Sequence, residues 1–368
     1  MRFTIDETNK VKGVAICLLI FHHLYRTIDK IEKAGIATTL ITKDQLADIA
    51  VNTRLIVWVF AFLSAYGLSI VYAKSKKNFV SKRYFRLMNP YWFTIVVIWL
   101  LAFIIKDIDK VYSKHQLVYR LFDFFALSDL MGTPKVSGVF WYMSFAIVQV
   151  LVFPLLYNGC KKYGWLMLPV SAIVLLYLKT GIYSQQGGAY RDYLLMTELG
   201  ILFAQYQVFE QIPDKERKIY LRIIEFLLFL IAAYSFAYLR NHILDEKYSI
   251  LRQLSMSLGA LCLIIGVFVD IRSKYISNIL IYLGRYSGFM FLTHSFFIDY
   301  ARFIYFSGNV IVTWLLCILL TLLSAILLKY MSEKSGYNAL VEKVSNKVCG
   351  LFNKYLISTL PECWKENS

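Results

Sequence analysis

The sequence has little charge, and most of that charge is positive. Asp, Glu, Lys and Arg make up 17% of its 368 residues, whereas a soluble domain has about 25%. Hydrophobic residues reach 58%. This balance argues against an ordinary soluble enzyme and predicts an integral membrane protein that crosses the bilayer several times.

Acidic residues are scarce beside basic ones, 24 against 40, which gives a formal net charge of +16. A basic surface can bind nucleic acid. Here, however, many Lys and Arg residues lie in short stretches beside apolar runs, notably at 74–86 and after residue 328. That distribution is typical of the cytoplasmic segments of membrane proteins, so no nucleic-acid partner is expected.

Several chemical motifs are missing as well. The sequence has no Walker-type phosphate loop, no G-x-G-x-x-G opening a helix, no H-E-x-x-H and no Cys/His cluster. Nucleotide hydrolysis and zinc chemistry therefore have no support, and no metal is expected. Six prolines are too few to suggest the paired broken helices of many transporters. No cysteine lies in a loop predicted to be outside, so no disulfide framework is expected. The six are Cys17, Cys160, Cys262, Cys317, Cys349 and Cys363.

Ten apolar runs are long enough to be membrane helices, which predicts an all-α polytopic bundle of about ten transmembrane helices. They lie at 11–28, 52–73, 90–105, 140–158, 165–180, 194–209, 221–239, 251–271, 280–300 and 309–330. An even number puts both termini on one side, and the excess of Lys and Arg there makes that side cytoplasmic. Residues 1–330 are predicted to form one membrane domain. Residues 331–368 are predicted to be a basic amphipathic tail on the inner membrane surface.

The first apolar run carries the most informative feature, His22 and His23. An ionisable residue inside a membrane span is costly, so it indicates a function by default. Lys12 precedes His23 by eleven residues, which is about three helical turns and 16 Å. The two side chains therefore share one helix face, with the lysine at the membrane surface and the histidine near mid-bilayer. His22 is turned about 100° away and is expected to orient its neighbour or to pack.

A second histidine lies in a later run. His294 comes ten residues after Gly284, at a depth similar to that of His23, so the two histidines can frame one site. A purely structural histidine is the alternative reading. Glu198 is a further polar group within a span, and Trp141 and Tyr142 stand at the outer mouth of the run at 140–158.

Arg83 and Arg86 lie in the basic stretch before the third run. They are three residues apart and so are neighbours on a helix surface. Arginine forks suit phosphate oxygens. The alternative is that they only set the topology, because a cytoplasmic loop needs basic residues without any ligand.

These residues resemble motifs of the membrane-bound acyltransferase-3 family, which includes bacterial sugar and polysaccharide O-acyltransferases. Its first span has a basic residue, ten intervening residues and a histidine, as in Lys12 to His23, often with arginine where this chain has lysine. Three further stretches of the chain resemble the family's R-x-x-R before a proline-aromatic start, its W-F/Y-x-S and its L-G-x-x-S-x-x-x-F-L-x-H. They are Arg83 to Trp92, Trp141 to Ser144, and Leu283 to His294.

The resemblance covers about residues 8–330. It implies acyl-CoA from the cytoplasm as co-substrate, a glycan acceptor outside, and no bound cofactor. It also implies that His23 is the catalytic residue and that Lys12, Arg83 and Arg86 lie near the CoA phosphates. We group His22 and His294 with His23 as catalytic candidates. Candidates for the acceptor pocket are Trp141, Tyr142, Ser144 and Glu198.

The sequence thus predicts an O-acyltransferase, with acetyl as the expected group, in the cytoplasmic membrane of a bacterium. Neutral His23 is expected to take the proton of the acceptor hydroxyl, or else to carry the acyl group covalently. Two other classes stay open. A glycan exporter would transport glycan without consuming acetyl-CoA, and a structural or sensory partner of a polysaccharide synthase would tolerate loss of Lys12.

Overall fold

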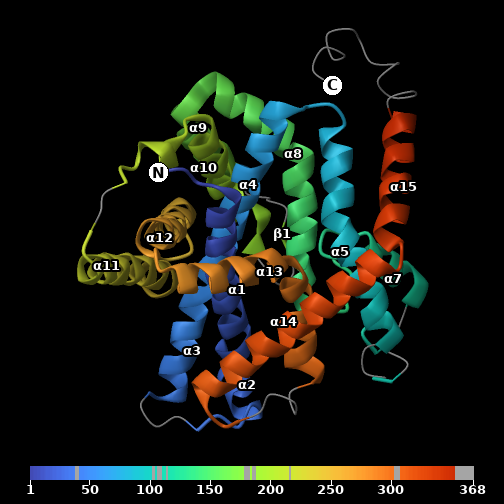
Figure 1. Cartoon of the computed structure of the whole chain (residues 1–368), viewed down its shortest axis with the longest axis horizontal. Helices are drawn as coiled ribbons and strands as arrows, with labels where there is room; N and C mark the ends of the chain where they lie inside the picture. Colours follow the sequence, from blue (N-terminus) through green and yellow to red (C-terminus); the bar gives the residue numbers. More distant parts are fainter. Residues whose placement is uncertain are drawn as a thin grey trace.

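The computed structural model describes residues 1–37, 41–101, 104–105, 110–112, 115–177, 183–184, 188–214, 217–301 and 307–352. Nearly all of its regular structure is helical (Figure 1). The helices are α1 (Ile5–Tyr25), α2 (Ile28–Lys33), α3 (Lys43–Asn52), α4 (Ile56–Lys74), α5 (Phe79–Leu101), α7 (Gln116–Phe124), α8 (Trp141–Tyr163), α9 (Met167–Tyr177), α10 (Leu194–Gln205), α11 (Ile219–Tyr238), α12 (Ser249–Asp270), α13 (Lys274–Tyr300), α14 (Val310–Lys334) and α15 (Tyr337–Phe352).

Short elements join these helices. A two-residue antiparallel pair, β1 (Tyr183–Ser184) and β2 (Gly188–Ala189), is an exception to the all-α prediction. The other short elements are single helical turns: η1 (Thr53–Leu55), η2 (Gly138–Phe140), η3 (Gly164–Leu166), η4 (Tyr190–Tyr193), η5 (Val208–Gln211) and the π-helical η6 (Leu239–Ile243).

Each of the ten predicted runs contains a helix, and within the described residues six helical stretches are long and apolar enough to cross a membrane. They are Lys43–Lys74, Phe79–Leu101, Gly138–Ile173, Ile219–Ile243, Ser249–Asp270 and Val310–Lys334. Helix α10 has only 12 residues, and α1 and α13 carry the polar residues of the candidate site. The membrane helix bundle is thus confirmed, while ten spans and cytoplasmic termini stay predictions.

The molecule has two ends, which we name by their contents. The N-terminal face holds Met1, whose ammonium donates to the Ile212 carbonyl at 2.7 Å, and Lys10, whose ammonium donates to the Ile271 carbonyl at 3.0 Å. The α2–α3 face is the opposite end, and α1 runs from one to the other (Figure 1). Helix α1 therefore connects the two surfaces of the bundle.

Helix α13 packs closely against α1, and two glycines make this possible. A Cβ on Gly13 would overlap the carbonyl of Leu280, and a Cβ on Gly284 would overlap the carbonyl of Asn9. Small residues allow helix backbones to approach within a membrane. The backbones of the two helices that carry His23 and His294 are thus in direct contact.

The segment between the predicted runs at 90–105 and 140–158 forms an ordered cap in its described part. The buried Asp123 carboxylate accepts hydrogen bonds from Tyr112 Oη at 2.5 Å, Tyr91 Oη at 3.2 Å and the Val136 amide at 2.7 Å. Burial raises the pKa of Asp123 to about 6, although those three hydrogen bonds lower it. A second buried carboxylate, Asp129, pairs with the ammonium of a lysine in the same loop.

Beyond residue 330 the structure describes two helical segments, the last turn of α14 and helix α15. Helix α14 extends to Lys334, past the predicted domain end at 330, and α15 packs on α5 through Tyr337, whose hydroxyl donates to the Asn89 carbonyl at 3.0 Å. The other face of α15 exposes Leu340, Val344 and Leu351. The amphipathic tail at 331–368 and its place on the inner membrane surface stay predictions.

Candidate active site

The candidate site is built on α1, which is one unbroken helix from Ile5 to Tyr25. Lys12 and His23 therefore lie about 16 Å apart along one helix. His23 belongs to the last turn of α1, and its carbonyl accepts a hydrogen bond from Lys30 Nζ at 3.1 Å. The histidine thus lies near the α2–α3 face, because α1 ends at Tyr25. Its depth in the membrane stays a prediction.

The three candidate histidines come together at this point. The ring centroids of His22 and His23 are 4.9 Å apart, and those of His23 and His294 are 5.1 Å apart with their planes tilted by 43°. The imidazole of His23 thus has a second imidazole on each side. His23 itself is half-buried, whereas His294 is fully buried.

Both flanking histidines are fixed by a backbone carbonyl. His22 Nδ1 lies 2.7 Å from the Ala50 carbonyl, and His294 Nδ1 lies 2.7 Å from the Phe291 carbonyl. Since a carbonyl only accepts, each Nδ1 must carry the proton, and each Nε2 is left with its lone pair. Within the described part of the chain, Nε2 of His294 has no hydrogen-bond partner. His294 therefore presents a fixed, buried acceptor nitrogen close to His23.

Two cations near the histidines were not predicted from the sequence. The charge of Lys30 acts on His22, His23 and His294, and that of Arg26 acts on His22 and His23. Lys30 reaches α1 because α2 turns back over the end of that helix. The sequence shows only that Lys30 follows His23 by seven residues. This spacing does not predict the contact, because α1 ends between the two residues and α2 begins in a new direction.

The predicted phosphate-binding residues also gather in one place. Arg86 acts electrostatically on Lys12 and on Arg83, so the three cations lie near one another. Arg86 is exposed, while Lys12 and Arg83 are half-buried. The Arg83 guanidinium lies 5.9 Å from the Phe79 ring centroid. Such a group can bind several phosphate oxygens at once.

Of the acceptor-pocket candidates, Tyr142 lies nearest to the histidines. Its ring is 5.4 Å from that of Phe291, which in turn is 5.8 Å from the His294 ring. Trp141 is one step further away and stacks with Tyr193 at 5.7 Å. These aromatic rings connect the histidines to η4.

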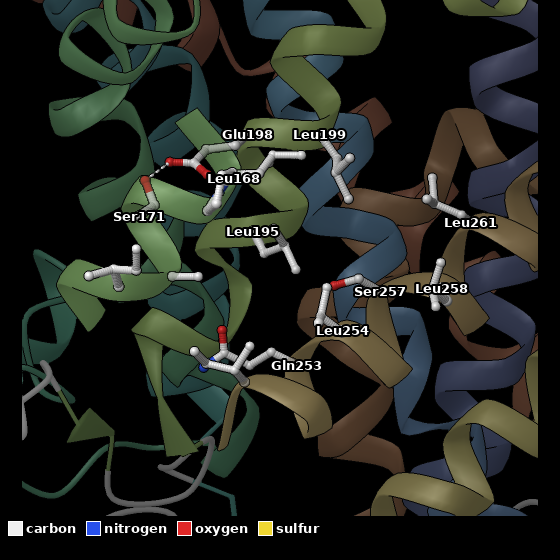
Figure 2. A pocket seen from close by; sticks show the side chains of 14 residues that line it. Leu168, Ser171, Leu195, Glu198, Leu199, Gln253, Leu254, Ser257, Leu258 and Leu261 are labelled. Atoms are coloured by element: carbon white, nitrogen blue, oxygen red, sulfur yellow. Dashed lines mark hydrogen bonds between the residues drawn. The ribbon is translucent and has the colours of Figure 1, made fainter. Parts of the chain in front are cut away.

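The other two candidates have different surroundings. Ser144 is buried, and its hydroxyl donates to the Ala126 carbonyl at 2.5 Å, so it fastens the cap to α8. Glu198 accepts a hydrogen bond from Ser171 at 2.5 Å and lines a separate pocket between α9, α10 and α12 (Figure 2). The contacts of these two side chains therefore lie away from the histidines.

No metal site is found among the residues that the structure describes, since no three His, Cys, Asp or Glu side chains are grouped to hold an ion. The site thus offers imidazoles and two cations, Arg26 and Lys30, near the α2–α3 face. A second group of cations lies around Lys12, nearer the other end of α1.

Comparison with known proteins identifies the family to which the chain belongs. A search of curated proteins and a search of solved structures give no match to this chain. A family model described as an acyltransferase domain matches residues 8–330. This range runs from the second turn of α1 through most of α14 and includes every histidine and cation of the candidate site. The chain therefore belongs to the acyltransferase-3 family of membrane acyltransferases.

Proposed function

We propose that this membrane acyltransferase moves an acetyl group from cytoplasmic acetyl-CoA to a hydroxyl of an exported or cell-envelope glycan, in the cytoplasmic membrane of a bacterium. The observation that carries the proposal is the position of the His23 ring, 5.1 Å from His294 and three helical turns from Lys12. Transfer of an acyl group from a donor on one side of a membrane to an acceptor on the other needs a cation that binds the donor's phosphates and a base near the acceptor. One continuous helix carries both groups.

The cationic group at Lys12, Arg83 and Arg86 supports CoA binding. CoA carries its phosphates on the nucleotide end and its thioester at the end of a long, thin arm. With the phosphates held near Lys12, the arm has about 16 Å of helix to follow to His23. The thioester then reaches the histidines while the nucleotide stays on the N-terminal face.

In the proposed reaction, neutral His23 accepts the proton of the acceptor hydroxyl as that oxygen forms a bond to the thioester carbonyl carbon. The carbon–sulfur bond then breaks, the new ester is released, and the protonated histidine returns its proton to the CoA thiolate. General base catalysis of this kind contributes roughly 10² to 10⁴ in rate. The fixed ring of His294, 5.1 Å from that of His23, positions His23 by packing against it.

A covalent route uses the same atoms. His23 attacks the thioester carbonyl through its lone pair, the carbon–sulfur bond breaks, and the ring proton of the acylated histidine passes to the CoA thiolate. The acceptor oxygen then displaces the histidine from the acyl carbon, and the hydroxyl proton returns to the imidazole. The two routes differ in one observable, because only the covalent one labels the protein when no acceptor is present.

The test uses purified full-length protein and acetyl-CoA that is radiolabelled in the acetyl group. His23→Ala should abolish label transfer to a mixed glycan acceptor, whereas His115→Ala, a control at an exposed histidine of the cap, should not. Full activity in a correctly folded His23→Ala protein would contradict both the general-base route and the covalent route. Glycan transport without acetyl-CoA consumption would favour an exporter, and normal activity after Lys12→Ala would remove the assigned CoA site.

A further inference from the structure

A second site lies between α9, α10 and α12, away from the histidines. It is a pocket of about 490 Å³ whose walls are mainly apolar, with six leucines among the 14 lining residues. This volume is within the range of small-molecule sites. Figure 2 shows Glu198 and Ser171 at one end, Gln253 at the other, and leucines such as Leu195 between them. The pocket is therefore apolar along its length and polar at its ends.

The pocket opens on the side of the bundle. Its lining residues Ile173, Leu254 and Leu258 are 54%, 39% and 45% exposed. All three belong to stretches that are apolar enough to cross a membrane. In the bilayer this opening faces lipid chains, so a hydrocarbon chain can enter from the side.

Its length suits such a chain. The lining residues of α12 extend from Ile250 to Leu261, which is about 16 Å of helix. Half the hydrocarbon thickness of a bilayer is about 15 Å. The pocket thus runs along the half of α12 that begins near η6, at the end of the bundle where Asn241 donates to Asn52 of α3.

The Gln253 end of the pocket leads to an arginine cluster, which we define as Arg54, Arg191, Arg240 and Arg252. Gln253 donates to Asp192 at 3.3 Å. The carboxylate of Asp192 lies 4.0 Å from both Arg191 Nε and Arg240 Nη2, and Arg54 and Arg252 also act on it electrostatically. Four positive charges therefore surround one negative charge, a net +3 for these five side chains.

The guanidinium groups of the cluster are held in place. Arg240 is 8% exposed, stacks 5.4 Å from the Trp58 ring centroid and donates to Asn241 Oδ1 at 2.9 Å. Arg252 donates to the Leu244 carbonyl at 3.1 Å. Pre-placed arginines with this excess of charge suit a phosphate group, whose oxygens accept paired N–H donors.

We propose that this site binds an anionic lipid, with one hydrocarbon chain in the α9–α10–α12 pocket and its phosphate on the arginine cluster. The contact from Gln253 to Asp192 makes pocket and cluster contiguous, so a single amphipathic molecule can occupy both. The pocket is separate from the histidines, whereas Arg54 of the cluster also acts electrostatically on His22. Lipid binding does not depend on acyl transfer. It selects lipids by two features at once, a chain and a phosphate.

The experiment uses delipidated full-length protein in detergent and a photoreactive phosphatidic acid with its reactive group in mid-chain. Labelling should fall on 168–173, 195–199 and 250–261. Unlabelled phosphatidic acid should compete at least tenfold better than diacylglycerol with the same chains, because the latter lacks the phosphate. Equal competition by the two lipids would overturn the proposal.

Two pairs of variants separate the pocket from the cluster. Leu258→Trp at the pocket rim should weaken labelling about tenfold or more, while Leu251→Trp, equally exposed on α12 but outside the pocket, should not. Arg252→Gln should remove the preference over diacylglycerol, while Lys247→Gln should preserve it. Unchanged labelling in Leu258→Trp, or full displacement by inorganic phosphate alone, would show that no lipid chain is bound there.

Discussion

The imidazole rings of His23 and His294 lie 5.1 Å apart although they come from the first and one of the last long helices of the chain. His294 is the better fixed of the two, since its Nδ1 is bound to the Phe291 carbonyl and its ring is fully buried. We therefore assign proton acceptance to His23 and positioning to His294.

Substitution of His294 tests this division of roles. His294→Ala should lower kcat about 100-fold, because His23 loses the neighbouring ring that orients it, while the KM for acetyl-CoA stays within about twofold. The pH–rate profile should also shift, since a misoriented base titrates in a different environment. A pure rise in KM, or an unchanged pH profile with lost activity, would indicate a structural residue instead.

Lys12 is expected to act on binding and not on the chemical step. Lys12→Ala should raise the KM for acetyl-CoA about tenfold with little change in kcat, because the phosphate contact is the same in ground and transition states. Lys12→Arg should retain wild-type KM or improve it. Lys82→Ala is the control, an exposed lysine of the same basic stretch. A fall in kcat alone would place Lys12 in the reaction itself.

The close contact between α1 and α13 predicts strong sensitivity at one glycine and tolerance at another. Gly284→Ala should destabilise the protein by about 1–3 kcal/mol, because the added methyl group forces the backbones apart. Gly288→Ala, one turn further along α13, meets nothing within 4 Å and should be neutral or stabilising. Thermal unfolding in detergent measures both, and equal melting temperatures would contradict the contact.

The cap should respond to pH through Asp123. Its pKa is about 6 in the folded protein, above the ordinary value of 3.8, so the folded state binds the proton more tightly than the unfolded chain does. The free energy of unfolding should therefore fall as pH rises from about 4 to about 6, by about 1.4 kcal/mol for each pH unit in that window. Asp123→Asn should remove this slope, which chemical denaturation at a series of pH values measures. A slope that persists in the variant would assign it to other carboxylates.

Much of the site follows from helix geometry alone. The common face of Lys12 and His23 is set by a spacing of eleven residues, and the similar depth of His23 and His294 follows from counting along two apolar runs. Each of these inferences needs only the rise and pitch of a helix. The ten apolar runs correspond to helices for the same reason.

Other features depend on contacts between distant segments. Lys30 reaches His23 only because α2 folds back over α1, and the arginine cluster draws Arg54, Arg191, Arg240 and Arg252 from four separate segments. Their spacing in the sequence has no helical or strand period, so it gives no signal. Glu198 could be identified from the sequence as a polar residue within an apolar run. Its neighbours could not be predicted, because they come from α9 and α12.

The glycine contact also acts as the pivot of a lever. Gly13 is ten residues from His23 and Gly284 is ten residues from His294, so each histidine sits on an arm of about 15 Å. A rotation of about 4° between α1 and α13 at that pivot changes the separation of the rings by about 1 Å, enough to matter for a reacting geometry. A ligand that changes the separation of the N-terminal ends of these two helices would therefore also change the separation of the two imidazole rings, although it touches neither ring.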